Sequence, residues 1–503
     1  MTSVRERRAG ITVSKPADRP KIDVTTSPAH GTARGISVGM SGAVPKELGL
    51  DRKTLTALGF EGKAGQVLVL AKEPPAVAVG IGNVGTVDAA RLRDAAAAFA
   101  RALPRHASLS TDLADAPGVP SDVAGQAIVE GMLLARYTYD ELKSNPSTTR
   151  LETINLTANS RAVENVRKGA DRGQIFAEAA MFARDLANSP PAYLTAVRMA
   201  DVATRIAKDT GLKVEVFDKD ALVRMGCGGL LGVNAGSTEP PRMIKLTYAP
   251  NGGRSARRSG HLTLVGKGIM YDSGGISLKP SDGVHATMKQ DMSGAGAILA
   301  AMSALKALDC KTAVTGYLMC TDNMPSGSAT KLGDVLTIRG GTTVEVMNTD
   351  AEGRLVMADA LVLAAEEAPD AIVDIATLTG ACLRALGPRI AGAFGNNQPL
   401  MGQIEASARE TDEPVWELPM ERSYRSELNS DIADMKNMGG PNGGAIHAAL
   451  FLEEFVAGLP WAHLDIAGPV LVDSDDGWKP KGSSGFGARL LLDLALKFQA
   501  PAR

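Results

Sequence analysis

The sequence predicts an α/β protein with two domains, a smaller N-terminal α/β domain and a larger C-terminal domain in which helices flank a mixed sheet. Three observations predict this fold class. The length of 503 residues exceeds what one ordinary hydrophobic core covers. Short apolar runs of strand length alternate with longer runs of helical spacing. A helical stretch that stops at Asn-Ser-Pro-Pro, ending at Pro191, divides the chain into two series of such runs.

The N-terminal part contains a tail and a small domain. Residues 1–35 are rich in Arg, Lys, Pro, Ser and Thr with little hydrophobic periodicity, so we expect a flexible tail there. Residues 36–165 alternate between strand and helix patterns. Strands are expected at QVLVLA and AVAVGIG, and helices at DAARLRDAAAAFARAL and QAIVEGMLLARY. This order predicts an N-terminal α/β domain over residues 36–165.

The rest of the chain contains a linker helix and the larger domain. Residues 166–190 are the expected linker helix, because apolar residues recur at helical spacing up to the proline breaker. Residues 191–503 follow as one domain. Its strand candidates are KVEVFD, MIKLTY, HLTLVG, TAVTGYLM, AIVDIATL and WAHLDIAG. Its helix candidates are Met292–Leu308, Leu355–Ala368, Ala445–Ala457 and Gly487–Phe498. Apolar strands separated by helices are typical of a mixed sheet covered on both faces.

Composition argues against several classes of partner. The net charge of -2 gives no general electrostatic reason to bind nucleic acid. Apolar runs such as LLLDLAL are far shorter than the roughly 20 residues that span a bilayer. The N-terminus lacks the apolar core of a signal peptide, and the four cysteines have no CxxC spacing. We therefore expect buried thiols in a reducing compartment and a cytoplasmic protein.

Two motifs suggest chemistry that their surroundings do not support. VGIGNVG places Gly80, Gly82 and Gly85 in the GxGxxG spacing of a dinucleotide site, but no acidic residue ends a second strand at the required distance. A tight turn is the simpler interpretation, and a nicotinamide-dependent oxidoreductase is kept as the alternative function. Asp-Ser-Gly-Gly around Ser273 resembles the nucleophile motif of serine proteases, but no histidine stands in the matching setting. Ser273 is therefore expected to be a bystander.

Two clusters of ionisable residues lie in glycine-rich stretches after apolar strands, where α/β folds place their sites. The first contains Lys267, Asp272, Lys279 and Asp291. The second is NTDAEGRL, with Asp350, Glu352 and Arg354. If this second segment is extended, alternation of side chains puts all three of its charged residues on one face.

Several carboxylates brought together would repel one another unless cations intervene. Each residue alone could serve as a turn residue, a helix cap or a surface charge. Together they suit hard divalent cations, because carboxylate oxygens bind Mg, Mn or Zn and histidine is dispensable. The absence of HExxH argues only against thermolysin-like zinc proteases.

At this point the residues carry a resemblance to a known family. VGKGIMYDSGGISLKP, KQDMSGAG, NTDAEGRLVMADAL and DIATLTGA resemble the signatures of the cytosolic leucyl aminopeptidase family. The resemblance extends through WAHLDIAG and covers roughly Ala183 to Leu496. It implies that residues 191–503 are a catalytic metallopeptidase domain. The first domain is similar only in outline to the family's variable N-terminal domain.

The resemblance implies a site with two divalent metal ions per subunit, Mn or Zn. Asp272 and Glu352 would bridge both ions, Asp350 would complete one site, and Asp291 with a neutral Lys267 would complete the other. Lys279 would stay charged and polarise the scissile carbonyl. Arg354 would hold a bicarbonate ion that acts as general base.

The resemblance also implies the substrate and the assembly. Met288, Thr377 and Gly380 match positions that line an apolar pocket for the first residue of a peptide. The implied reaction is removal of the N-terminal residue, with leucine and other apolar residues favoured. A homohexamer is implied as well. One departure is a residue more than the usual spacing between Lys279 and Asp291.

Overall fold

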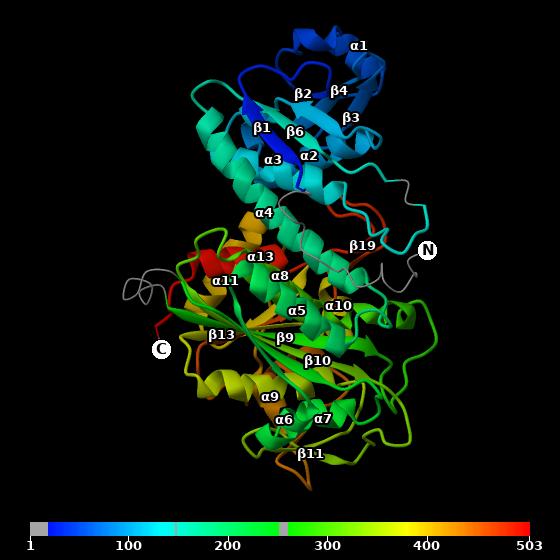
Figure 1. Ribbon diagram of the computed structural model, residues 1–503, viewed down its shortest axis with the longest axis vertical. Helices are drawn as coiled ribbons and strands as arrows, with labels where there is room; N and C mark the ends of the chain where they lie inside the picture. The colour runs from blue at the N-terminus through cyan, green and yellow to red at the C-terminus, as the bar shows by residue number, and fades with distance from the viewer. Residues whose placement is uncertain (1–18, 146–147, 251–259, 503) are drawn as a thin grey trace. The chain divides into compact units, whose positions relative to one another are not determined.

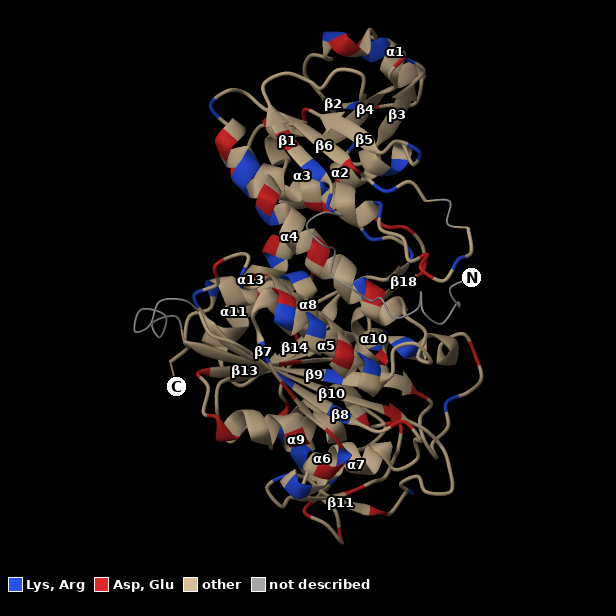
Figure 2. Ribbon diagram, in the orientation of Figure 1, with Lys and Arg blue, Asp and Glu red and all other residues tan. Residues whose placement is uncertain are grey.

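The computed structural model describes residues 19–145, 148–250 and 260–502, which form two compact units (Figure 1). Among these residues, one unit contains 19–181 and 472–482, and the other contains 182–471 and 483–502. Helix α4 (Val163–Asn188) carries the chain from the first unit into the second. Basic and acidic residues are interspersed on the ribbon of each unit (Figure 2). The predicted two-domain α/β fold is confirmed.

The N-terminal unit is built on a six-stranded sheet in the order β1-β6-β5-β2-β4-β3. Only β3 runs antiparallel to its neighbour. The strands are β1 (Lys21–Thr25), β2 (Ala33–Gly39), β3 (Val67–Leu70), β4 (Ala76–Gly82), β5 (Ser108–Thr111) and β6 (Thr153–Thr157). The helices besides α4 are α1 (Arg52–Ala57), α2 (Ala89–Ala102) and α3 (Ser121–Ala135). Strand β4 is buried on both faces: Ala76 and Ala78 pack beside α1, and Val77 and Val79 pack beside α2 and α3.

The prediction of a flexible tail up to residue 35 is wrong for its second half. Residues Lys21–Thr25 form β1, which pairs in parallel with β6, and β2 begins at Ala33. The short sequence KIDVT offers only Ile22 and Val24 at alternate positions, because β1 is a short, partly exposed strand at the edge of the sheet. Residues 1–18 of the predicted tail lie outside the described residues.

The glycines of the GxGxxG motif serve packing. The amide of Gly80 donates to the carbonyl of Gln66 at 2.7 Å, and the amide of Gly82 donates to the carbonyl of Gly62 at 2.9 Å. A Cβ added at Gly80 would lie 2.1 Å from the carbonyl oxygen of Lys63. The segment 62–66 therefore fills the space that a dinucleotide pyrophosphate would need. Its carbonyl groups also accept the hydrogen bonds of the Gly80 and Gly82 amides, which would otherwise bind the pyrophosphate.

The C-terminal unit is built on an eight-stranded mixed sheet in the order β15-β14-β17-β13-β9-β10-β8-β7. Strands β9, β10, β13 and β17 are parallel to one another. Strand β8 pairs antiparallel with β10 and β7, and β14 pairs antiparallel with β17 but parallel with β15. The strands are β7 (Lys213–Phe217), β8 (Arg242–Tyr248), β9 (His261–Asp272), β10 (Ala313–Asn323), β13 (Ala371–Ala376), β14 (Ala391–Gly395), β15 (Val415–Glu417) and β17 (Trp461–Asp465). Short strands outside this sheet are β11 (Val335–Thr337), β12 (Thr343–Glu345), β16 (Met435–Lys436), β18 (Leu471–Val472) and β19 (Gly482–Ser483).

Helices cover both faces of this sheet (Figure 1). One face carries α5 (Ala196–Thr210), α8 (Ser293–Ala304), α11 (Gln398–Thr411) and α13 (Ala488–Lys497). The other carries α6 (Lys219–Met225), α7 (Gly228–Asn234), α9 (Gly353–Glu366) and α12 (Gly444–Glu453), and α10 (Gly380–Leu386) follows β13. All six strand candidates and all four helix candidates of this domain correspond to elements.

The four cysteines are free and buried, as predicted. Within the described ranges no helix is long and apolar enough to cross a bilayer.

Candidate metal centre

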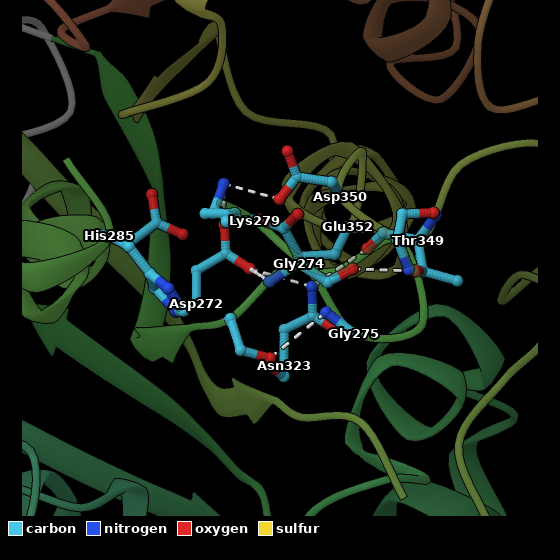
Figure 3. Close-up of polar contacts among 12 residues, drawn as sticks. Asp272, Gly274, Gly275, Lys279, His285, Asn323, Thr349, Asp350 and Glu352 are labelled. Carbon is cyan, nitrogen blue, oxygen red and sulfur yellow. Dashed lines mark hydrogen bonds and ion pairs between the residues drawn. The ribbon is translucent and has the colours of Figure 1, made fainter. Parts of the chain in front are cut away.

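The first ionisable cluster lies at the end of β9. Lys267 is within this strand and Asp272 is its last residue. The chain then turns through Gly274 and Gly275, whose φ angles of 89° and 65° suit residues without a Cβ. The turn brings Lys279 back, so that its ammonium lies 2.8 Å from Oδ2 of Asp272. Figure 3 shows Asp272, Lys279, Asp350 and Glu352 gathered in one place.

The second cluster lies at the start of α9 and is not extended. Asp350 lies in a turn, Glu352 caps the helix, and Arg354 is in the first helical turn. The amides of Leu355 and Val356 both donate to the carbonyl of Glu352, which starts the helical hydrogen bonding there. The charged residues converge through this turn, not through alternation along a strand.

Two lysines connect the clusters. The ammonium of Lys267 lies 2.8 Å from the carboxylates of Asp291 and Glu352, and it donates to the carbonyl of Thr377 at 2.9 Å. The ammonium of Lys279 lies 2.5 Å from Oδ1 of Asp350. Asp291 comes from the 3-10 helix His285–Met292 that precedes α8. The sequence-predicted ligands Lys267, Asp272, Asp291, Asp350 and Glu352 are therefore brought together, with Lys279 beside them.

The cluster is buried except at Asp350, whose side chain is 33% exposed, and it has an excess of negative charge. Four carboxylates face two ammonium groups, and Asp272, Asp291 and Glu352 are each 6% exposed or less. Burial, together with the charge of Asp272, raises the pKa of Glu352 to about 8. Burial lowers the pKa of Lys267, but the charges of Asp291, Glu352 and Asp272 outweigh it and raise that pKa above its ordinary value. Burial is thus the main cause of the raised pKa of Glu352, and the nearby carboxylates are the cause of the raised pKa of Lys267.

The donor set fits divalent cations. Asp272, Asp350 and Glu352 offer carboxylate oxygens that lie within 4.8 Å of one another. Oε2 of Glu352 is buried and has no hydrogen-bond partner among the described residues. Such oxygens bind Mn, Zn or Mg and would be costly to bury without a cation. A neutral Lys267 amine requires bound cations to lower its pKa, because the carboxylates alone raise it.

Arg354 is buried beside this cluster and remains a cation at neutral pH. Burial lowers its pKa to about 10, and the charges of Glu352 and Asp465 oppose that shift. One guanidinium nitrogen donates to the carbonyl of Asn437 at 2.8 Å. Within the part of the chain that the structure describes, its Nε is buried without a hydrogen-bond partner. A small anion could satisfy this guanidinium.

The residues expected to line a pocket differ in their contacts. The hydroxyl of Thr377 donates to Oδ1 of Asp291 at 2.7 Å, so this side chain contacts a candidate metal ligand. Met288 is partly buried in the 3-10 helix that carries Asp291. Gly380 is exposed at the first position of α10. The hydroxyl of Ser273 already donates a hydrogen bond to the carbonyl of Asn323 at 2.6 Å.

Sequence reasoning missed two buried asparagines. Asn437 accepts from the amide of Met347 and donates to the carbonyls of Asn348 and Ala351, so it holds the turn that carries Asp350. Asn323 donates to Asp272. Uncharged residues far away in sequence give little signal of such a role. The glycine-rich setting KNMGGPNGG is the one hint around Asn437.

Two descriptions of protein families match this chain. Residues 181–492 match "Cytosol aminopeptidase family, catalytic domain", and residues 49–146 match "Cytosol aminopeptidase family, N-terminal domain". The chain belongs to the cytosol aminopeptidase family. This makes it a metal-dependent peptidase of the aminopeptidase class, and the nicotinamide-dependent alternative is not supported.

Relatives match over nearly the whole length of this cytosol aminopeptidase family member. A protein of Streptomyces avermitilis named "Probable cytosol aminopeptidase" is 43% identical, and the match covers 95% of each chain. A protein of Chlorobaculum tepidum with the same name is 45% identical over 75% of each chain. The solved structure entitled "Bottromycin maturation enzyme BotP in complex with Mn" is 37% identical, covers 93% of this chain and 99% of that one, and has a TM-score of 0.85.

Proposed function

We propose that this family member releases the N-terminal residue of peptides with two bound divalent ions, manganese or zinc, and favours leucine and other apolar residues. One observation carries the proposal: carboxylates from separate segments meet, and the ligand oxygens of Asp272, Asp350 and Glu352 lie within 4.8 Å of one another. The similar BotP structure, whose title names Mn, supports manganese as one of the candidate metals.

Two ions would be held by five residues. Asp272 and Glu352 would serve both ions, Asp350 would complete one site, and Asp291 with a neutral Lys267 amine would complete the other. When bound, the ions supply an activated water and polarise the carbonyl that it attacks. Thr377 supports this arrangement, because its carbonyl accepts from Lys267 and its hydroxyl donates to Asp291.

Lys279 stabilises the negative charge that develops on the scissile carbonyl oxygen. Burial lowers the pKa of Lys279, but the charges of Asp272 and Asp350 raise it above its ordinary value, so the side chain stays charged at working pH. Its side chain is 18% exposed, whereas that of Lys267 is 4% exposed. Lys279 is therefore the lysine that a substrate can reach.

Arg354 holds a bicarbonate ion. The flat fork of a guanidinium matches a planar anion, and its Nε is free to donate. Bicarbonate supplies the general base that takes a proton from the attacking water. Arg354 itself keeps its proton, because even its lowered pKa of about 10 lies above neutral pH.

The proposal extends to specificity and assembly. Met288, Thr377 and Gly380 line the apolar pocket for the first residue, and one bound ion would hold the free α-amino group, which would confine cleavage to that residue. A cytoplasmic homohexamer that acts on peptides is expected. A monomer or dimer by light scattering at working concentration would refute the hexamer.

Hydrolysis of leucine p-nitroanilide tests the proposed function. We expect activity that disappears on chelation, returns with Mn or Zn, and is lost in Glu352→Ala. Ser273→Ala should retain it. If Ser273→Ala abolishes hydrolysis while chelation or Glu352→Ala does not, the metal proposal is wrong.

A further inference from the structure

Asn323 lies opposite Asp272 across two parallel strands. It is the last residue of β10, and a register shift between Thr321 and Asp322 sets it level with the last residue of β9. Only 4% of Asn323 is exposed. Its carbonyl accepts from both the amide and the hydroxyl of Ser273, which fixes the backbone beside the glycine turn. The shift leaves Met270 of β9 without a partner on β10 and brings the side chain of Asn323 level with the candidate ligands.

The side-chain amide of Asn323 joins the two ligand segments. Its Nδ2 donates to Oδ1 of Asp272 at 2.9 Å and to the carbonyl of Thr349 at 2.9 Å (Figure 3). Both partners are oxygens that carry no hydrogen, so the amide nitrogen is the atom that faces them. Asp272 belongs to the first cluster, and Thr349 directly precedes Asp350 of the second.

Close packing keeps the amide in this orientation. A Cβ added at Gly275 would lie 2.7 Å from Oδ1 of Asn323 and 3.0 Å from Oγ1 of Thr349. The glycine therefore leaves only enough room for the amide oxygen. Thr349 is held in turn, because its hydroxyl donates to the carbonyl of Gly274 and accepts from the amide of Ser277.

These contacts leave the two oxygens of Asp272 in different environments. Oδ1 accepts from the amides of both Gly274 and Asn323. Oδ2 faces Lys279. We infer that Asn323 is a positioning residue, which fixes the rotation of the Asp272 carboxylate and the spacing of Asp272 from Asp350 for cation binding. This inference rests on the proposed function, since it takes Asp272 and Asp350 as metal ligands.

Manganese binding to the metal-free full chain, measured by isothermal titration calorimetry, tests the inference. Asn323→Ala removes the side-chain hydrogen bonds to Asp272 and to the carbonyl of Thr349. Asn323→Asp keeps the size and shape of the side chain, but it replaces the donating nitrogen by an oxygen that faces two acceptor oxygens. Removing a partner that orients a ligand typically weakens metal binding 10- to 100-fold, and we expect Asn323→Ala in that range and Asn323→Asp at its upper end. We also expect excess manganese to restore part of the kcat of Asn323→Ala.

Asn234→Ala is the matched control. Asn234 is equally buried in the same unit, and its Nδ2 also donates to two oxygens, those of Glu239 and Thr321. We expect this variant to lose thermal stability but to keep its manganese affinity. If Asn323→Ala binds manganese as wild type does, or if Asn234→Ala weakens binding equally, the inference is overturned. The proposed function fails separately if Asp272→Asn binds manganese as tightly as wild type.

Discussion

Gly353 lies directly against the side chain of Lys267. A Cβ added at Gly353 would lie 2.6 Å from Cε and 2.9 Å from Nζ of that lysine. The first residue of α9 thus makes room for a side chain that comes from β9, and it sets the distance between the amine and Glu352. This close approach explains why a glycine stands between Glu352 and Arg354.

We predict that Gly353→Ala weakens manganese binding about tenfold or more, because the added methyl group displaces the Lys267 amine. Alanine is otherwise favoured over glycine in helices by about 1 kcal/mol, so general destabilisation of α9 is not expected. Gly402→Ala on α11 is the control, since a Cβ there would meet no atom within 4 Å among the described residues. Unchanged manganese affinity in Gly353→Ala would contradict the ligand role of Lys267.

Asp465 is expected to control selectivity through the loop that follows β13. Its buried carboxylate accepts from the amides of Leu378 and Thr379 and from the hydroxyl of Thr379. This loop carries Thr377 and leads into Gly380, the first residue of α10. We predict that Asp465→Asn raises KM several-fold more for leucine p-nitroanilide than for alanine p-nitroanilide. An unchanged preference would show that the loop does not form the pocket.

Arg354 is expected to make hydrolysis dependent on bicarbonate. General-base catalysis typically contributes a factor of about 10² to 10⁴, and we predict a fall in kcat of at least about 10² for Arg354→Ala. Arg354→Lys keeps the charge but loses the planar fork, so it should recover little activity. The measurement is kcat against bicarbonate concentration. A variant without Arg354 that responds to bicarbonate as wild type does would refute the anion site.

Stability should depend on pH through Glu178 in the N-terminal unit. Burial raises its pKa from 4.5 to about 7, although the nearby Arg19 opposes the shift. The folded chain therefore favours the neutral acid. Its contribution to stability is fully present below about pH 4.5 and is lost as the pH rises through 7, with an upper limit on the order of 3 kcal/mol.

Glu178→Gln keeps the neutral form at every pH. We predict that the unfolding temperature of wild type falls relative to this variant between pH 5 and pH 8, as followed by calorimetry. Glu164→Gln, at an exposed position of the same helix, should follow wild type. Parallel curves for wild type and Glu178→Gln would mean that burial does not shift the pKa of Glu178.

The fold was largely predictable because buried strands leave long apolar runs. β9 is buried along almost its whole length, and its sequence indicates a strand up to Gly266. The continuation through Asp272 was less visible, since it contains Lys267, glycines and an acid. β1 gave little signal because KIDVT is short and has only two apolar residues, Ile22 and Val24.

The charged residues of the site were also predictable, since their residue types indicate cation chemistry. The contacts that bring these residues together could not be predicted from the sequence. Asn437 holds the turn around Asp350 from a segment that comes after β16, and Asn323 reaches Asp272 through a register shift between β9 and β10. Such hydrogen bonds depend on tertiary contacts that no local pattern encodes. Residues 350–354 form a turn and the start of α9, and no local pattern distinguished this conformation from an extended one.

The number of manganese ions bound per chain tests the central claim most directly. The metal-free protein should be titrated with manganese by calorimetry, and the bound metal should then be counted by atomic absorption. We predict two ions in wild type and one in Asp350→Asn, with hydrolysis of leucine p-nitroanilide falling in parallel. Two ions in Asp350→Asn, or full hydrolysis by a chain that binds none, would contradict the account.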